Sequence, residues 1–152
     1  MLLAVSYALG VLVGVLNGVN LNVLERRDPA VYGGLSLRQL EERVGEWGRE
    51  LGCDVVCRQT NSEGEYVDWC QELGETADGL VVNAGAWSHY SYAIRDAVEL
   101  FTVPVVEVHL SNVAEREAWR QTSVIADVVA HRVIGRGPDG YRAALEHLTG
   151  AG

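Results

Sequence analysis

The hydrophobic residues divide the chain into short apolar runs and longer stretches in which apolar positions recur every three or four residues. Short runs bounded by polar residues or glycine are typical of strands buried on both faces of a sheet, and the periodic stretches are typical of amphipathic helices. We predict strands at residues 10–16, 53–58 and 79–82, in the run that begins at Val103, and near 132–134.

Helices are predicted between these strands from their periodicity and their end signals. Ser36 and Gln39 form a capping box at the start of the first helix, which Gly52 ends, and residues 61–64 open the second. Further helices are predicted at residues 88–100 and around Tyr141. The inward positions are Leu37, Leu40, Val44, Trp47 and Leu51, then Val67, Cys70, Leu73 and Gly74, then Ala93, Ile94, Ala97 and Val98, and finally Tyr141, Ala144, Leu145 and Leu148.

Strands that alternate with helices through short connections indicate a parallel sheet covered on both faces. Five strands in 152 residues predict a flavodoxin-like, doubly wound α/β fold. We interpret residues 1–152 as a single domain, with residues 1–9 as a short N-terminal extension that runs into the first strand. Ligands of such folds bind beyond the carboxyl ends of the strands, so a site is expected where these runs end in polar residues.

Charge and composition narrow the possible partners. The net charge is −9, which disfavours nucleic acids and anionic membranes, so an anionic small molecule would need a local cluster of arginines. All 12 basic residues are arginine, and the absence of lysine excludes chemistry through a lysine Schiff base. Three cysteines without metal-ligand spacing predict a reduced, cytoplasmic protein with no metal site.

The run that begins at Val103 carries a carboxylate and an imidazole. Glu107 and His109 are two residues apart, so they point to the same side of the strand. A charged residue in a buried strand is costly without a partner or a role, which favours a site over a structural pair. Asn112, three residues before Glu115, predicts a helix start, and Arg116 and Arg120 would then share one face of that helix.

A second group of polar residues lies in the segment 20–34. We interpret this segment as a lid because it leaves the same end of the sheet, although most such loops are only solvated connections. Tyr32 would serve as a base only if cations stabilised its phenolate, and Arg27 and Arg116 are candidates. His89 alone is equally consistent with a structural histidine and a substrate ligand.

The motif at residues 135–140, GRGPDG, is interpreted as a turn, because the chain beyond it is too short for a dinucleotide-binding unit.

These residues together resemble the type II 3-dehydroquinate dehydratases. The similarity extends from about Gly10 to Leu148. The matching residues are 16–21 (LNGVNL), 27–29 with Tyr32 and Gly33, 83–85, Ser88 with His89, 94–96, 107–112 (EVHLSN), Arg116 with Glu117, Arg120, and Gly140 with Tyr141.

The resemblance implies an activity and an assembly. It implies a hydro-lyase that converts 3-dehydroquinate to 3-dehydroshikimate by anti elimination through an enolate, with no metal or organic cofactor. The subunits would form a dodecamer, arranged as a tetramer of trimers.

The resemblance also implies roles for individual residues. Tyr32, stabilised as tyrosinate by Arg27, would remove the proton at C2, and Asn20 would hold a water molecule that stabilises the enolate. His109, oriented by Glu107, would protonate the departing C1 hydroxyl group. The expected substrate-binding residues are Asn83, His89 and Arg120 at the ring hydroxyls, the amides around Leu110 and Ser111 at the carboxylate, Arg116 in the basic cluster beside the tyrosine, and Asp96, which would reach the site of a neighbouring subunit.

Several positions depart from the family pattern. Val19 replaces a usual proline, Glu25 a small residue near Arg27, and Trp87 and Tyr90 add bulk around His89. Asp127 and the pair His131–Arg132 stand where small apolar residues are usual. These departures leave open a paralogous lyase or cyclase of specialised metabolism that acts on a related cyclic polyol or keto compound. A further alternative, from a different class, is a non-catalytic assembly or binding protein that has kept the fold.

Overall fold

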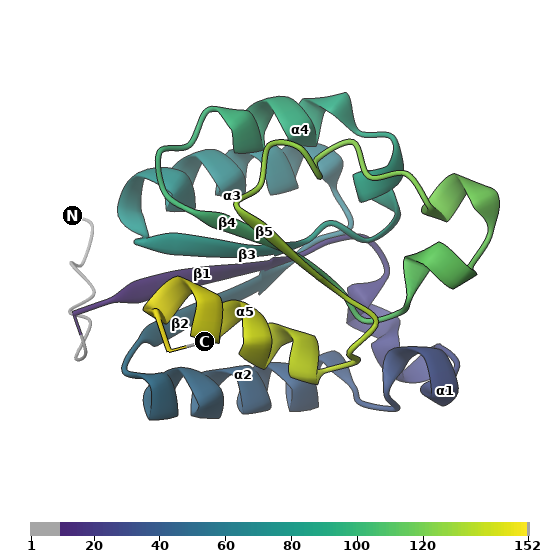
Figure 1. Cartoon of the computed structure of the whole chain (residues 1–152), viewed down its shortest axis with the longest axis horizontal. Coiled ribbons are helices and arrows are strands. Elements are labelled where there is room, and N and C mark those ends of the chain that lie inside the picture. The colour runs from purple at the N-terminus through teal and green to yellow at the C-terminus, as the bar shows by residue number, and fades with distance from the viewer. Residues whose placement is uncertain (1–9, 152) are drawn as a thin grey trace.

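The computed structural model describes residues 10–151, which form a five-stranded parallel sheet between two layers of helices (Figure 1). The strand order is β2-β1-β3-β4-β5. The prediction of a flavodoxin-like doubly wound fold is confirmed, whereas the predicted extension at residues 1–9 lies outside the described residues. The strands are β1 (Leu12–Asn17), β2 (Asp54–Gln59), β3 (Gly79–Asn83), β4 (Val105–His109) and β5 (His131–Ile134).

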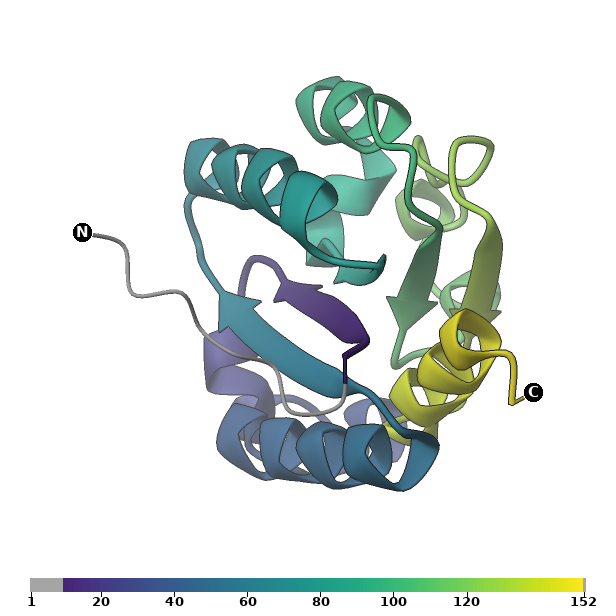
Figure 2. The ribbon, with the colours of Figure 1, turned by 90° about the vertical axis from the view of Figure 1, so that its left-hand side faces the viewer.

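Two helices cover each face of the sheet, as the rotated view shows (Figure 2). On one face, α2 (Leu37–Leu51) and α5 (Asp139–Thr149) pack against the strand side chains that point toward them, and together they form one hydrophobic core. On the other, α3 (Glu63–Thr76) and α4 (Tyr92–Glu99) enclose a second core, in which Tyr66 and Ile94 are fully buried. Among residues 10–151, no helix combines the length and the hydrophobicity that crossing a bilayer requires.

The helix-end signals of the sequence act as predicted in three places. Ser36 and Gln39 form the complete capping box of α2, and Gly52 ends that helix with a left-handed backbone. Ser62 caps α3 by accepting a hydrogen bond from the amide of Glu65. Each helix therefore begins close to its predicted residue, because a side chain bonds the amides that the first turn leaves unpaired.

Three predictions of local structure are wrong. The helix expected at 88–100 is divided into the 3-10 helix η2 (Gly85–His89) and α4, because Ser91 starts a new helix by accepting from the amide of Ile94, and Ala93 is exposed rather than inward. His89 therefore ends a helical turn instead of starting one. The helix expected to carry Arg116 and Arg120 is two 3-10 helices, η3 (Val113–Glu115) and η4 (Ala118–Arg120), separated by an extended residue at Arg116.

The third of these concerns the loop expected at residues 20–34, which contains the 3-10 helix η1 (Leu21–Arg26) and the short helix α1 (Pro29–Tyr32). In α1, Asp28 caps the helix through Ala30 and Pro29 occupies the first helical position. Both segments lie beyond the carboxyl ends of the strands, next to η3 and η4 (Figure 1). The chain thus brings polar residues from distant parts of the sequence to one edge of the sheet.

Candidate active site

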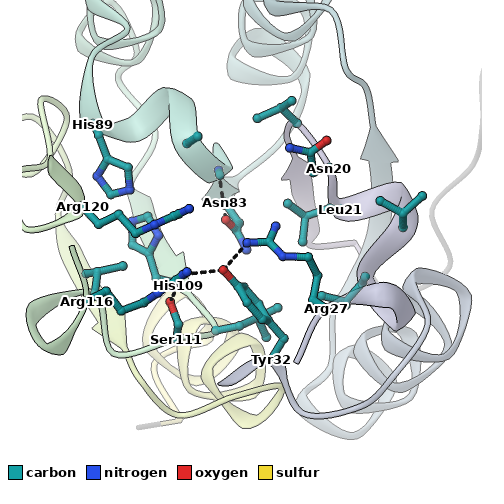
Figure 3. Close-up of a pocket in the computed structure, with 17 residues that line it drawn as sticks. Asn20, Leu21, Arg27, Tyr32, Asn83, His89, His109, Ser111, Arg116 and Arg120 are labelled. Atoms are coloured by element: carbon teal, nitrogen blue, oxygen red, sulfur yellow. Dashed lines mark hydrogen bonds between the residues drawn. The ribbon is translucent and has the colours of Figure 1, made fainter. Parts of the chain in front are cut away.

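A pocket of about 270 Å³ opens beyond the carboxyl ends of β1, β3 and β4 (Figure 3). Three arginines are among the residues that line it, and none of those residues is an aspartate or a glutamate. In a protein of net charge −9, this wall is locally suited to an anion. The lining residues are Val19, Asn20, Leu21, Val23, Leu24, Arg27, Tyr32, Asn83, Gly85, Ala86, His89, His109, Leu110, Ser111, Val113, Arg116 and Arg120.

Two guanidinium groups converge on the phenol of Tyr32. Arg27 and Arg116 each donate a hydrogen bond to Tyr32 Oη, one from the segment before α1 and the other from the link between η3 and η4. Their Cζ atoms also lie 4.1 Å and 5.3 Å from the centroid of the tyrosine ring. An oxygen that accepts from two cations is better stabilised as an anion than as a neutral hydroxyl group.

The predicted pair of Glu107 and His109 is present at the end of β4. His109 Nε2 lies 2.6 Å from Glu107 Oε1, so this nitrogen donates and Nδ1 is left for another partner. Glu107 is fully buried, yet Ser123 also donates to Oε1 at 2.7 Å and Arg132 donates to Oε2 at 2.8 Å. Burial alone would raise the pKa of Glu107, but its bonds to His109, Arg132 and Ser123 lower that pKa below the ordinary value of 4.5.

His89 lies beside His109 in the pocket wall. The two imidazoles are nearly parallel, with centroids 5.9 Å apart, and His89 Nδ1 donates to the carbonyl of Thr122 at 2.8 Å. Burial, with His109 and Arg120 nearby, lowers the pKa of His89 below 6.5, although the bond to Thr122 opposes the shift. A neutral His89 presents its other nitrogen as a hydrogen-bond acceptor.

Arg120 and Arg116 reach the pocket although they share no helix. Arg120 Nε lies 2.8 Å from Glu117 Oε2, and its guanidinium group lies over the ring of Trp119, with Cζ 4.1 Å from the centroid. Trp119 in turn meets His89 edge-on at 5.3 Å. These contacts fix the direction of Arg120 in place of the helix that the sequence predicts.

Asn83 belongs to a buried hydrogen-bond network below the pocket. Its amide nitrogen donates to Tyr141 Oη at 2.9 Å, and Tyr141 Oη donates to Asn17 Oδ1 at 2.6 Å. The amide of Gly85 donates to Asn83 Oδ1 at 3.2 Å. The network therefore joins β1, β3 and α5 and fixes the orientation of Asn83. Burial also raises the pKa of Tyr141 well above its ordinary value, so this phenol is a neutral structural group.

Within residues 10–151, no group of three or more histidine, cysteine, aspartate and glutamate side chains is arranged to hold a metal ion. The cysteines are unpaired, and burial raises the pKa values of Cys57 and Cys70 to about 12. These thiols are therefore unsuited to act as nucleophiles at neutral pH.

The family model described as dehydroquinase class II matches residues 11–149, which is almost the whole described chain. The chain belongs to this family. The predicted family is confirmed, and with it the enzyme class, a hydro-lyase.

Similar proteins agree with this assignment to the class II dehydroquinases. Two relatives named 3-dehydroquinate dehydratase are 50% identical over 136 residues (Deinococcus radiodurans; 89% of this chain and 95% of the relative) and 48% identical over 131 residues (Pelotomaculum thermopropionicum; 86% and 91%). The crystal structure of a type II dehydroquinase from Propionibacterium acnes is 42% identical, with a TM-score of 0.88, and the match covers 91% of this chain and 96% of that one.

The structure of this class II dehydroquinase brings most of the predicted site residues into one pocket. Glu107 lies behind the wall and touches the pocket only through His109. Asp96 is exposed on α4 and does not line the pocket of its own chain. The residues found in the wall as predicted are Asn20, Arg27, Tyr32, Asn83, His89, His109, Leu110, Ser111, Arg116 and Arg120.

Three residues that support the site were not predicted to do so. Ser123 and Arg132 bond Glu107, and Tyr141, which was given only as an inward residue of its helix and as a family match, bonds Asn17. Arg132 stood out in the sequence because it is a charged residue in a strand expected to be apolar. Its partner Glu107 could not be predicted, because the pairing depends on the register of β4 and β5. No local pattern identifies Ser123, which lies in an irregular segment.

Of the four departures from the family pattern closest to the expected site, only one lines the pocket. Val19 forms part of the wall, whereas Glu25 is exposed and does not line the pocket. Trp87 is buried against Tyr66, with the ring centroids 5.6 Å apart, and Tyr90 is exposed outside the pocket. Glu25 forms no ion pair with Arg27 within the described part of the chain.

Proposed function

We propose that the protein removes water from 3-dehydroquinate to give 3-dehydroshikimate. The observation that carries the proposal is the pair of groups in one pocket, a phenol between two guanidinium groups and an imidazole held by a buried carboxylate. Elimination of water beside a ketone requires a base for the neighbouring proton and an acid for the departing hydroxyl group. The names of the relatives support this choice of substrate.

Tyr32 is the proposed base. As a phenolate, it takes the proton from C2, next to the C3 carbonyl of the substrate, and the electron pair of the broken C–H bond forms the enolate. Arg27 and Arg116 stabilise the phenolate before the transfer, and both remain bonded to the oxygen after it becomes neutral. These two hydrogen bonds are the support for Tyr32 as the base.

Asn20 is the proposed support of the enolate, through a water molecule that it holds. Asn20 lines the pocket and has a left-handed backbone with φ of 69°. The backbone N–H group of Asn20 donates to Asn61 Oδ1 at 2.9 Å, which holds this unusual backbone conformation in place. A donor fixed before the reaction stabilises the developing charge without reorganising.

His109 is the proposed acid. Its Nε2–H group is bound by Glu107, so in the imidazolium form the proton on Nδ1 is available to the C1 hydroxyl group. Transfer of this proton lets the C1–O bond break with loss of water, while the enolate electrons form the new double bond. The reaction then ends with a neutral His109 and a protonated Tyr32, and a proton passing back from Tyr32 to His109 through solvent resets the site.

The remaining residues of the wall are proposed to bind and orient the substrate. Asn83, His89 and Arg120 bind ring hydroxyl groups, and the amides around Leu110 and Ser111 bind the carboxylate. No cofactor takes part in these steps. Asp96, which does not line the pocket of its own chain, is proposed to complete the site of a neighbouring subunit, and the family resemblance is the reason that we also propose the dodecamer.

The alternative of a paralogous enzyme rests on Val19, Glu25, Trp87 and Tyr90, of which only Val19 lines the pocket.

Purified protein incubated with 3-dehydroquinate should produce the absorbance of a conjugated enone. Borohydride added with the substrate should leave the activity intact, since no lysine is present to form an imine. No product at enzyme concentrations close to that of the substrate would contradict the proposal.

A further inference from the structure

Arg132 is the second residue of β5 and lies directly opposite Glu107 of β4 in the parallel ladder. Its Nε atom is 2.8 Å from Glu107 Oε2, whereas His109 and Ser123 occupy the other oxygen. Glu107 is fully buried, and the Arg132 side chain is 32% exposed. The carboxylate is therefore shared between an imidazole that faces the pocket and a guanidinium group that lies outside it.

The two ionisable partners of Glu107, His109 and Arg132, differ in whether their charge changes. In the proposed reaction His109 loses its proton to the substrate and becomes neutral, but the guanidinium of Arg132 stays charged. An ionised carboxylate that is fully buried is costly when no cation remains beside it. Without Arg132, that cost would fall on the step in which His109 gives up its proton.

We propose that Arg132 is a positioning residue of this enzyme, which keeps Glu107 ionised and oriented while His109 releases its proton. Arg132 does not line the pocket, so it acts through Glu107 and not on the substrate. It also weakens the pull of Glu107 on the imidazolium proton, which makes His109 a stronger acid. The expected effect of Arg132 on turnover rests on the proposed function, whereas its expected effect on the titration of His109 does not.

The other charged or titratable groups around the pair stay the same when Arg132 is changed. His89 stacks on His109 from η2, and Arg116 and Arg120 line the same pocket. Tyr66 of α3 lies on the same side of the sheet as Glu107, donates to the carbonyl of Leu16 at 2.9 Å, and has its pKa raised well above the ordinary value by burial, so it stays neutral. A change in the titration of His109 on replacement of Arg132 therefore reports on the link through Glu107.

Four variants test the inference. Arg132→Met removes the charge and keeps the aliphatic stem, Arg132→Gln keeps a donor without charge, and Arg132→Lys keeps the charge. Arg142→Met is the matched control, because Arg142 is also ion-paired, at 2.8 Å to Glu50 and 3.1 Å to Glu146, but has no contact with Glu107.

The first measurement needs no substrate. Histidine side chains are titrated by NMR, with the His109 signal assigned from its loss in His109→Asn. We expect the titration midpoint of His109 to rise by about one pH unit in the Met and Gln variants, and to stay near the wild-type value in the Lys variant and in the control. Equal midpoints in the wild type and the Met variant would overturn the proposal.

The second measurement is the turnover of 3-dehydroquinate. We expect kcat of the Met and Gln variants to fall about tenfold, with the alkaline limb of the pH profile moved to higher pH, while KM changes less than about twofold. Arg132→Lys should recover most of kcat. A rise in KM at unchanged kcat, or no kinetic change at all, would show that the ion pair only fastens β5 to β4.

The two measurements separate the possible failures. A wild-type protein that does not act on 3-dehydroquinate would contradict the proposed function, and the titration would still decide whether Arg132 controls His109. If Arg132→Met does not fold, the Lys and Gln variants decide: a lower His109 midpoint in Lys than in Gln supports the proposal, and equal midpoints refute it.

Discussion

Tyr32 and His109 reach one pocket from α1 and β4, and each depends on partners from other elements. The phenol is bonded by Arg27 and Arg116, and the imidazole by Glu107, whose charge Arg132 balances. The proposed base therefore lies between cations and the proposed acid next to an anion. Each residue thus has surroundings that stabilise the charged form it needs before the reaction.

Replacement of Tyr32 tests the base directly. Tyr32→Phe removes the oxygen that accepts the proton, so we expect kcat to fall by about 10²–10⁴-fold. The ring is only partly buried, so the free energy of unfolding should change by less than about 1 kcal/mol. Stopped assays of enone formation and urea unfolding measure the two effects.

Replacement of Glu107 tests its ionisation through the pH dependence of stability. Its pKa in the folded protein lies below 4.5, so its ionised form stabilises the fold above the pKa of the unfolded chain, and this contribution is lost as the pH falls through the folded value. We expect Glu107→Gln to unfold at lower urea concentration than the wild type at pH 7, with the difference shrinking as the pH falls below about 4.5. A difference that is constant between pH 7 and pH 3 would contradict an ionised Glu107.

At the scale of the elements, β1 and β3 and the helices α2, α3 and α5 were predictable because each buries an apolar pattern. β5 and the start of α4 were less predictable, because β5 buries only Val133 and Ser91 begins a new helix within the expected one. Ser36, Ser62 and Gly52 mark helix ends by local hydrogen bonding and backbone conformation, so these ends were close to their predicted positions. The site elements were less predictable. The segment that carries Arg116 and Arg120 resembles one helix in sequence, but it folds as two short turns whose side chains contact the pocket and Trp119.

The sequence predicted the residues of the site better than it predicted the residues that hold them in place. Glu107 and His109 follow from period two along one strand. The contacts of Glu107 with Ser123 and Arg132 depend instead on how strands far apart in sequence align, and one sequence carries no signal for that register. The roles of Tyr32 and Arg27 came from the family resemblance and not from periodicity.

The short helix α1 carries Tyr32 into the pocket wall. Gly33 ends this helix and lies next to Pro138, in the turn before α5. Gly33 has φ of 91°, and a Cβ there would lie 2.7 Å from Cδ of Pro138, whereas a Cβ at Gly34, with φ of 76°, would meet only Pro29 at 3.5 Å. Both substitutions by alanine strain the backbone, but only Gly33→Ala also pushes α1 away from Pro138. We expect Gly33→Ala to lower kcat at least about tenfold more than Gly34→Ala. Equal losses in the two variants would show that backbone strain alone matters.

At the scale of the whole molecule, charge is distributed unevenly. The chain carries a net charge of −9, yet Arg27, Arg116 and Arg120 face the pocket and no carboxylate lines it. The surface on and around α4 differs again, because Tyr90, Tyr92 and Leu100 are exposed there by 59%, 70% and 73%. Large apolar side chains exposed on one helix and its ends are typical of an interface between subunits when they gather on one surface. Asp96 lies on the same helix, which supports the proposal that it serves a neighbouring site.

Complementation between variants tests whether the site is shared. In an assembly that contains both Tyr32→Phe and Asp96→Ala subunits, a site can combine an intact Tyr32 with an intact Asp96 from its neighbour. We expect each variant alone to be nearly inactive, and co-expressed subunits to regain about a quarter of the wild-type activity, since random assembly gives both intact groups to that fraction of sites. Light scattering of the purified mixture measures the size of the assembly that carries the activity.

The matched control is Asp68→Ala, at an aspartate that is exposed on α3 and absent from the pocket wall. Alone it should retain full activity, because α3 contributes nothing to the proposed shared site. Mixing the two inactive variants after separate assembly should restore nothing unless subunits exchange, which separates complementation from a residual activity of either variant. Full activity of Asp96→Ala by itself, or full activity of a monomer, would show that each chain completes its own site, and the exposed face of α4 would then need another explanation.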